Sequence, residues 1–182
     1  MISQASTQKN FHEEAKVFSI TPITNSFILN YSEILISNPL MAVYQAVSTN
    51  GSDGNLYSIQ RIENVPNSAS LFWIRRWNHI MELLKSGSSG LLNYLACHME
   101  KNAKTETSTV YLVSEYTKNT LRTAKDKLNL SLADVIKAMY QISEALIDLK
   151  KQGHFHHCIN PDSIFVIENQ DRTYSYKLGN LG

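Results

Sequence analysis

The sequence predicts an α+β fold in which an antiparallel sheet comes first and a helical part follows. Three observations predict it: β-like segments dominate the first third, and strongly periodic apolar stripes mark helices at 68–87 and 132–149. Strands and helices that are grouped rather than strictly alternating are typical of α+β proteins. With 182 residues and 43% hydrophobic content, the chain can bury one core or two small lobes that share a cleft.

The first half contains three expected strands and one expected helix. The strands are "SFILNYSEILI", "LMAVYQAVST" and "LYSIQRIE". Asn50-Gly51 and Asp53-Gly54 lie between the last two, and glycine accepts the positive φ that hairpin turns require. In "SASLFWIRRWNHIMELLKSG", apolar residues recur at steps of three and four, and Gly87 is a plausible end. The tryptophans of this helix are expected in the core, or, if exposed, as partner anchors.

The second half begins with two more strands, "GLLNYLACHMEK" and "STVYLVSEY", followed by a short polar joint. A long helix follows, because Ser131 and Asp134 suit a capping box at its start and Gly153 suits its end. The segments "SIFVIENQ" and "YSYKLGN" predict a final hairpin.

Composition limits the classes of function. The net charge of +1 and the pI near 7.8 argue against an electrostatically driven nucleic-acid binder. No apolar run approaches the length of a membrane span, and residues 1–22 are expected to be a flexible leader without a secretory pattern. Cys97 and Cys158 form neither a disulfide framework nor a zinc site. We therefore expect an intracellular, cytoplasmic protein, with a nuclear location not excluded.

Five fragments in order resemble the protein kinase fold. "MAVYQA" is similar to the strand after the glycine-rich loop, "LYSIQRIE" to the strand with the cleft lysine, and "VYLVSEY" to the strand entering the hinge. "MYQISEALIDLKKQGHFHH" resembles the helix and start of the catalytic loop, and "KLGNLG" the metal-binding turn. The resemblance implies a kinase-like domain over 23–182, with an N-lobe at 27–116 and an incomplete C-lobe at 117–182. Because the helices that normally cover the second lobe would then be missing, the resemblance implies that one side of the apolar stripe from Leu132 to Leu149 is uncovered. We expect a fragment of a longer protein, with a truncated gene product or a surface completed by a partner as alternatives.

The same resemblance assigns the family's catalytic positions to residues that lack the required chemistry. The glycine-rich loop falls on Ile36, Asn38 and Met41, the cleft lysine on Gln60, its partner glutamate on His79, the catalytic aspartate on Cys158, and the metal ligands on Ser163 and Asn180. Phosphoryl transfer depends on positioning and charge neutralisation, so these neutral residues imply an inactive site. The implied nucleotide cleft would be lined by Ile36, Asn38, Met41, Ser58, Gln60, Ser114 and Tyr116. Weak ATP binding is the most that these residues suggest, with no metal or other cofactor.

Three alternatives concern residues near this site. Strand alternation places Arg61 on the face opposite Ser58 and Gln60, so Arg61 is expected to point away from the cleft. Asp162 is interpreted as a turn or surface residue rather than a displaced base. The cluster His154, His156, His157 and Cys158 has the wrong spacing for a tetrahedral metal site, and His156 is expected to pack under the loop, as that position does in kinases.

The sequence therefore predicts a pseudokinase that acts as a protein-binding scaffold or regulatory subunit. The alternatives are an ATP-binding conformational sensor and an unorthodox kinase. Short cues, among them "VYQAVST", "EYTKNTL" and "INP" followed by "SIF", resemble the pseudokinase subunits of poly(A)-nuclease deadenylation complexes. That resemblance implies an adaptor for mRNA deadenylation whose protein partner is a nuclease subunit.

Overall fold

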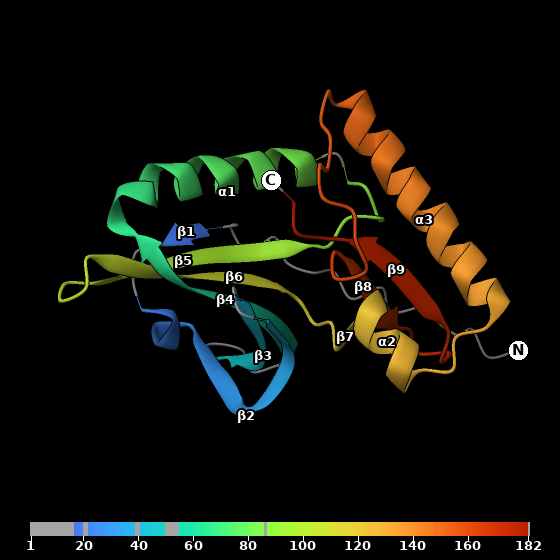
Figure 1. The fold of residues 1–182 in the computed structure, drawn as a ribbon, viewed down its shortest axis with the longest axis horizontal. Helices are drawn as coiled ribbons and strands as arrows, with labels where there is room; N and C mark the ends of the chain where they lie inside the picture. Colours follow the sequence, from blue (N-terminus) through green and yellow to red (C-terminus); the bar gives the residue numbers. More distant parts are fainter. Residues whose placement is uncertain (1–16, 20–21, 39–40, 50–54, 86, 182) are drawn as a thin grey trace, which may run out of the picture.

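A computed structural model describes residues 17–19, 22–38, 41–49, 55–85 and 87–181 of the chain. The fold is α+β and is built on two sheets, which confirms the coarse prediction. A six-stranded sheet has helix α1 over one face, and a three-stranded sheet packs against helix α3 at the opposite end of the molecule (Figure 1).

The larger sheet is antiparallel apart from one pair of strands. Its strands are β1 (Val17–Ser19), β2 (Phe27–Asn38), β3 (Met41–Ser48), β4 (Leu56–Pro66), β5 (Tyr94–Asn102) and β6 (Thr107–Glu115), in the order β1-β5-β6-β4-β3-β2. The parallel pair is β1 with β5, so the segment expected as a leader contains a short strand. The predicted turn at 50–54 lies outside the described residues.

Helix α1 (Ser70–Lys85) covers the sheet with an apolar face that matches the predicted periodicity only in part, since Leu71, at the start of the predicted stripe, is 66% exposed. Trp73, Trp77, Ile80 and Leu83 are buried, at the spacing of one helix face. Because Trp73 and Trp77 are only 6% and 2% exposed, both belong to the core and neither is available to anchor a partner. Two short 3₁₀ helices, Ile23–Asn25 and Asn67–Ala69, precede β2 and α1.

The polar joint after β6 contains structure that the sequence analysis missed. Strand β7 (Asn119–Thr120) is followed at once by helix α2 (Leu121–Lys127). Thr120 begins the helix through a capping box with Thr123, and Ala124 is fully buried. Seven residues are too few to show a helical period, so tertiary contacts rather than pattern define this helix.

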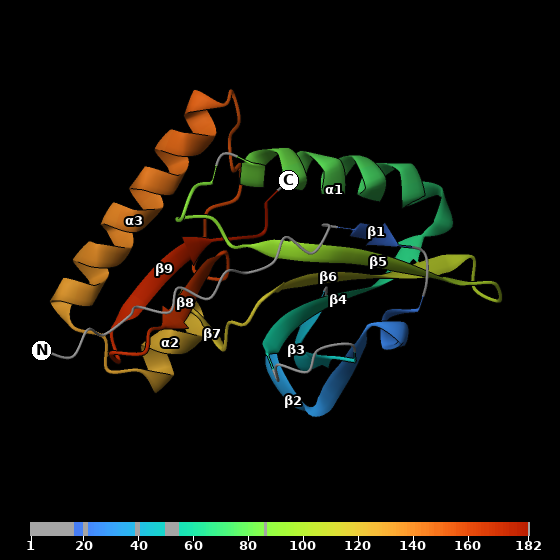
Figure 2. The same cartoon turned by 180° about the vertical axis from the view of Figure 1, so that it is seen from behind.

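Helix α3 (Leu132–Lys151) begins and ends where predicted. Asp134 N–H donates to Ser131 Oγ over 3.2 Å, and Ser131 N–H donates to Asp134 Oδ2 over 2.9 Å. The chain reverses at Gly153, whose φ of +77° suits glycine. Strands β8 (Ile164–Glu168) and β9 (Tyr174–Leu178) then form the predicted hairpin and complete the smaller sheet with β7. Both views place α3 at the outer edge of the molecule (Figures 1 and 2).

One hydrophobic cluster runs through both parts of the molecule. It joins Val43 and Val110 of the larger sheet to α1, and continues to Leu149 of α3 and Phe165 of β8. A second, smaller cluster lies on the other face of the larger sheet, around Ile59 and Tyr111. The two sheets are therefore held together by a shared core. Among the described residues, no helix is long and apolar enough to cross a membrane.

Candidate functional site

The loop Gly153–Ser163 lies between α3 and β8 and is tied to the turn that follows β9. His156 is 6% exposed, and its Nε2–H donates to the carbonyl oxygen of Gly179 over 2.7 Å. The expectation that His156 packs under the loop is confirmed. Gly179 is itself buried, and a side chain there would collide with the ring of Phe165. The contact therefore fixes the loop against a turn in which only glycine fits.

Asn180 occupies the next position in that turn, with a φ of +57°. Its N–H donates to the hydroxyl of Tyr94 over 2.9 Å, and its Nδ2 donates to the carbonyl oxygen of Asp162 over 3.3 Å. Burial raises the pKa of Tyr94, so its hydroxyl stays protonated. The Asn180 side chain thus connects the turn to the loop. As a neutral amide, it lacks the charged oxygen that an aspartate would offer to a metal ion.

Asp162 is the sole carboxylate in the sequence of the loop 153–163. Arg122 Nε, on α2, lies 2.9 Å from each of its two oxygens, and the Arg122 N–H donates to the carbonyl of Pro161 over 3.2 Å. The two side chains are 60% and 34% exposed, Arg122 being the more exposed. The carboxylate is therefore held in a surface ion pair, which agrees with its interpretation as a turn or surface residue.

Cys158, Asn160 and Ser163 form a compact network inside the loop. Ser163 is fully buried; its hydroxyl donates to the Asn160 carbonyl over 2.8 Å and accepts from the Asn160 N–H over 3.0 Å. Asn160 Nδ2 lies 3.3 Å from the sulfur of Cys158, whose side chain is exposed. These side chains stabilise the turn of the chain, and none of them is a carboxylate.

The connection from β6 to β7 is bonded to β4 through Ser58. The Thr117 N–H donates to Ser58 Oγ over 2.8 Å, and the Ser58 hydroxyl donates to the Thr117 carbonyl over 3.0 Å. Ser58 is 2% and Thr117 1% exposed. One side chain therefore satisfies both backbone groups of Thr117.

The other residues that were expected to line a nucleotide cleft differ in their burial. Ile36 is buried in the main cluster, whereas Gln60 and Tyr116 are half-buried. Ser114 pairs with Ser58 in the register of β4 and β6, and its hydroxyl lies 3.4 Å from the Ser58 carbonyl. The side chains of Asn38 and Met41 lie outside the described residues.

Arg61 points to the face of the sheet opposite Ser58, as predicted. Its guanidinium forms an ion pair of 2.6 Å with Glu63 and lies on the side of Tyr111 and the second cluster. It is 29% exposed in its side chain, so it is half-buried rather than a fully solvated surface arginine.

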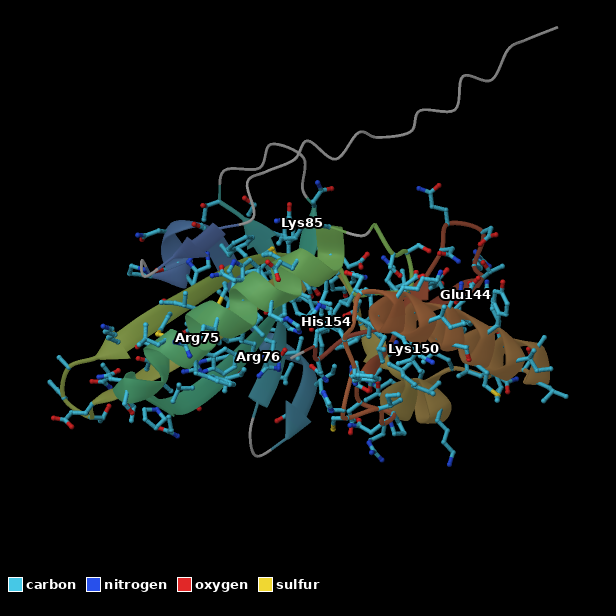
Figure 3. All side chains as sticks on the ribbon, turned by 90° about the horizontal axis from the view of Figure 1, so that it is seen from above. Arg75, Arg76, Lys85, Glu144, Lys150 and His154 are labelled. Carbon is cyan, nitrogen blue, oxygen red and sulfur yellow. The ribbon has the colours of Figure 1, made fainter. Side chains whose placement is uncertain are left out.

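Helix α1 contacts the loop and the turn through two basic residues. The rings of His79 and His154 meet edge to face with centroids 4.5 Å apart, and Figure 3 shows His154 between α1 and α3. Burial, followed by the charge of His154, lowers the pKa of His79. Arg76 donates from Nε and Nη2 to the Leu181 carbonyl over 3.2 and 3.1 Å, and its guanidinium lies 4.9 Å from the centre of the Trp73 ring. His79, which the resemblance assigned to the position of the lysine's partner glutamate, thus packs against His154.

A half-buried lysine on β9 is also paired. Lys177 of β9 lies 2.7 and 2.8 Å from the two carboxylate oxygens of Glu115, which also accepts the Asn93 N–H. Sequence reasoning missed Arg76, Arg122, Thr117 and Lys177, because their partners are far away in the chain and no local pattern marks them. Within the described part of the chain, no group of three or more potential ligands is arranged to hold a metal ion, and Cys97 and Cys158 are free thiols.

Two open pockets lie beside α3. The first, of about 480 Å³, is lined by Leu146, Leu149, Lys150, His154, Phe155, His156, His157 and Ile159. The second, of about 530 Å³, lies between the other side of α3 and β9 and is more polar. No family model matches the chain, and no curated protein matches it significantly.

Proposed function

We propose that the chain is a catalytically inactive, protein-kinase-like domain that serves as a protein-binding scaffold or regulatory subunit. The observation that supports this most directly is the state of Asp162, the one carboxylate in the loop that resembles a catalytic loop. It is paired with Arg122 through both oxygens. A base that accepts a proton from a substrate hydroxyl needs a free carboxylate, and the loop offers none.

The charges near the cleft support the same proposal. Phosphate binding requires cations that are free to meet oxygens, yet Lys177 is paired with Glu115 and Arg76 donates to the Leu181 carbonyl. The Thr117 backbone, which could pair with a base edge, is bonded to Ser58. Asn180 stands where the family has an acidic metal ligand, and its side-chain amide donates to the Asp162 carbonyl oxygen. These internal bonds stabilise a fixed shape and leave little for nucleotide chemistry, which suits a scaffold.

The test combines a transfer assay with a binding assay. The purified chain is incubated with radiolabelled ATP, Mg²⁺ and protein acceptors, and its melting temperature is measured with and without ATP and Mg²⁺. We expect no label on any acceptor and no shift, because a ligand that prefers the folded state must raise the melting temperature. Label that appears and is lost in Cys158→Ala or Asn180→Ala would show an unorthodox kinase. A shift of several degrees without label would favour the ATP-binding sensor.

Asp162→Asn is the matched variant for the loop. If the carboxylate is only half of a surface ion pair, this change should cost about 0–1 kcal/mol of stability and leave every activity unaltered. In affinity capture, Gln60→Ala and Cys158→Ala should retain the same protein partners as the wild type, with or without ATP. Loss of partners in both variants would contradict a scaffold that works without cleft chemistry.

The narrower prediction, an adaptor for a poly(A)-deadenylation complex, rests on the sequence resemblance alone. It expects a nuclease subunit as the partner and no direct RNA binding, in keeping with the net charge of +1. Capture of the tagged chain should then co-purify an activity that shortens poly(A). Capture of other partners without such activity would contradict this branch and leave the scaffold proposal standing.

A further inference from the structure

Two short pieces of chain before β2 lie against the larger sheet and are together called the strap here: β1 (Val17–Ser19) and the 3₁₀ turn with the proline before it (Pro22–Asn25). β1 pairs in parallel with Ala96–His98 of β5, at one edge of the sheet. The turn then lies on the face of the sheet away from α1 (Figure 1). The strap therefore contacts both an edge and the open face of the larger sheet.

Ile23 anchors the strap to that face. Its side chain is 1% exposed, whereas its neighbours Pro22, Thr24 and Asn25 are exposed. The surface that receives Ile23 is the second hydrophobic cluster, which β2, β3, β4 and β6 build from Leu29, Tyr44, Ala46, Ile59, Tyr111 and Val113. Backbone pairing at a sheet edge, combined with a side chain held in an apolar site, is how extended peptides bind to sheets. The strap has both features.

A carboxylate of β5 binds the backbone of the anchor. The Ile23 N–H donates to Glu100 Oε1 over 2.6 Å, and the Tyr111 hydroxyl donates to Glu100 Oε2 over 3.3 Å. Pro22 directly before the anchor has φ −53° and ψ 136°, and its ring fixes such a φ in the free chain as well. Because proline has no N–H, the first donor after it is the one that meets the carboxylate. The site is therefore complementary to a proline followed by a branched apolar residue.

We propose that the strap is a self-ligand: it occupies a peptide-binding site of the larger sheet that also accepts, from another chain, an extended segment with a proline followed by a branched apolar residue. The strap itself shows the chemistry of such a partner, with an extended stretch for the edge of β5 and one anchor for the second cluster. The inference goes beyond the proposed function, because it assigns a binding site and a kind of partner. It depends on neither the loop 153–163 nor α3.

The strap is attached less firmly than the strands that it covers. β1 pairs with β5 over Val17–Ser19 alone, whereas β4 pairs with β6 from Tyr57 to Pro66. Segments with a short ladder and few buried side chains open locally at a lower free energy than core strands do. Opening of the strap uncovers a strand edge and an apolar surface, both of which favour pairing with another segment. A peptide of the same chemistry restores the contacts that the strap gives up.

The covalent link to β2 sets the affinity that is expected for a separate peptide. A segment tethered by a short link has an effective concentration in the millimolar range. To stay bound in the folded chain at that concentration, the strap needs a Kd of about 0.1 mM or lower when it is supplied as a free peptide. A free peptide should therefore compete poorly with the intact strap, and should bind well to a chain whose strap has lost its anchor.

The first test measures the binding of a fluorescent peptide with the sequence of residues 15–26 to the full chain by anisotropy. Ile23→Asp should bind it with a Kd of about 0.1 mM or lower, and the wild type at least about tenfold more weakly. Thr24→Asp is the matched control, because Thr24 is the exposed neighbour of the anchor, and it should behave as the wild type. A peptide that carries Ile23→Asp should bind to none of the three chains. No binding to natively folded Ile23→Asp, or equal binding of both peptides, would overturn the proposal.

The same assay tests the carboxylate of the site. Glu100→Ala, combined with Ile23→Asp, should weaken peptide binding by about tenfold or more, because the acceptor of the anchor N–H is lost. A Kd equal to that of Ile23→Asp alone would contradict the site as described.

The second test uses the wild type and does not depend on any variant folding. Hydrogen exchange followed by mass spectrometry should show that the amides of the strap exchange together through local opening, with lower protection than those of β4 and β6. Protection of the strap equal to that of β4 and β6 would show that it is released only when the whole fold opens. That result would overturn the proposal of an exchangeable self-ligand.

Discussion

Ser58→Ala removes the hydroxyl that holds Thr117 and is the sharpest test of how the connection between β6 and β7 is fixed to β4. The hydroxyl accepts one buried N–H and donates to one buried carbonyl, over 2.8 and 3.0 Å. Leaving a buried backbone group unsatisfied costs about 1–3 kcal/mol. For the two groups together we expect a loss of about 3 kcal/mol, which lowers the melting temperature by roughly 6–12 °C for a chain of this size.

Thermal unfolding followed by circular dichroism measures this loss, and hydrogen exchange of the Thr117 amide locates it. The amide should be protected in the wild type and exchange faster in Ser58→Ala. Ser143→Ala is the control, because Ser143 is exposed on α3 and alanine favours a helix, so its stability should change by less than ~0.5 kcal/mol. A fall of less than a degree in Ser58→Ala, with the Thr117 amide still protected, would refute the argument that this hydroxyl satisfies the connection.

Three further outcomes are expected. Gly179→Ala should destabilise the fold by about 1–3 kcal/mol, measured by urea unfolding, because the added methyl overlaps the ring of Phe165; a neutral result would contradict the tight packing of the turn. Burial lowers the pKa of His79, so the unfolded chain takes up a proton first as the pH falls below about 6.5. The melting temperature should therefore drop between about pH 7 and pH 5, and this drop should be smaller in His79→Gln. The same pH dependence of the melting temperature in His79→Gln and the wild type would contradict this role of His79. Burial also raises the pKa of Cys97 to about 12, so a thiol reagent should modify exposed Cys158 alone in the folded chain and both thiols in denaturant. Rapid modification of both in the folded chain would contradict this.

Local patterns predicted the larger elements well. The periods of α1 and α3, the Ser131–Asp134 capping box, the stop at Gly153 and the final hairpin all appear in the structure as expected. These features depend on neighbours within one or two turns of chain, which a sequence displays directly. The strand β1 and the helix α2 were missed because each is too short to show a period, and both are defined by contacts with distant strands.

The candidate site was predictable in part. Strand alternation sufficed to predict that Arg61 points away, and the expectation that His156 packs under the loop came from the resemblance of this loop to a kinase catalytic loop. The sequence identified Asp162 as a turn or surface residue but did not identify its partner Arg122, which lies 40 residues earlier in the chain. Nor could it pair Ser58 with Thr117, 59 residues apart. No local spacing encodes such pairs.

The order of amino acids alone settled where the longer helices and strands lie, how α3 begins and ends, and that Asp162 is the one acidic residue of the loop 153–163. Only the tertiary structure decided which polar groups satisfy one another and which face of α3 stays open. Secondary structure follows from interactions between near neighbours, which are written in the sequence. Hydrogen bonds and packing between distant segments depend on how the two sheets come together around a shared core, and that arrangement exists only once the chain has folded.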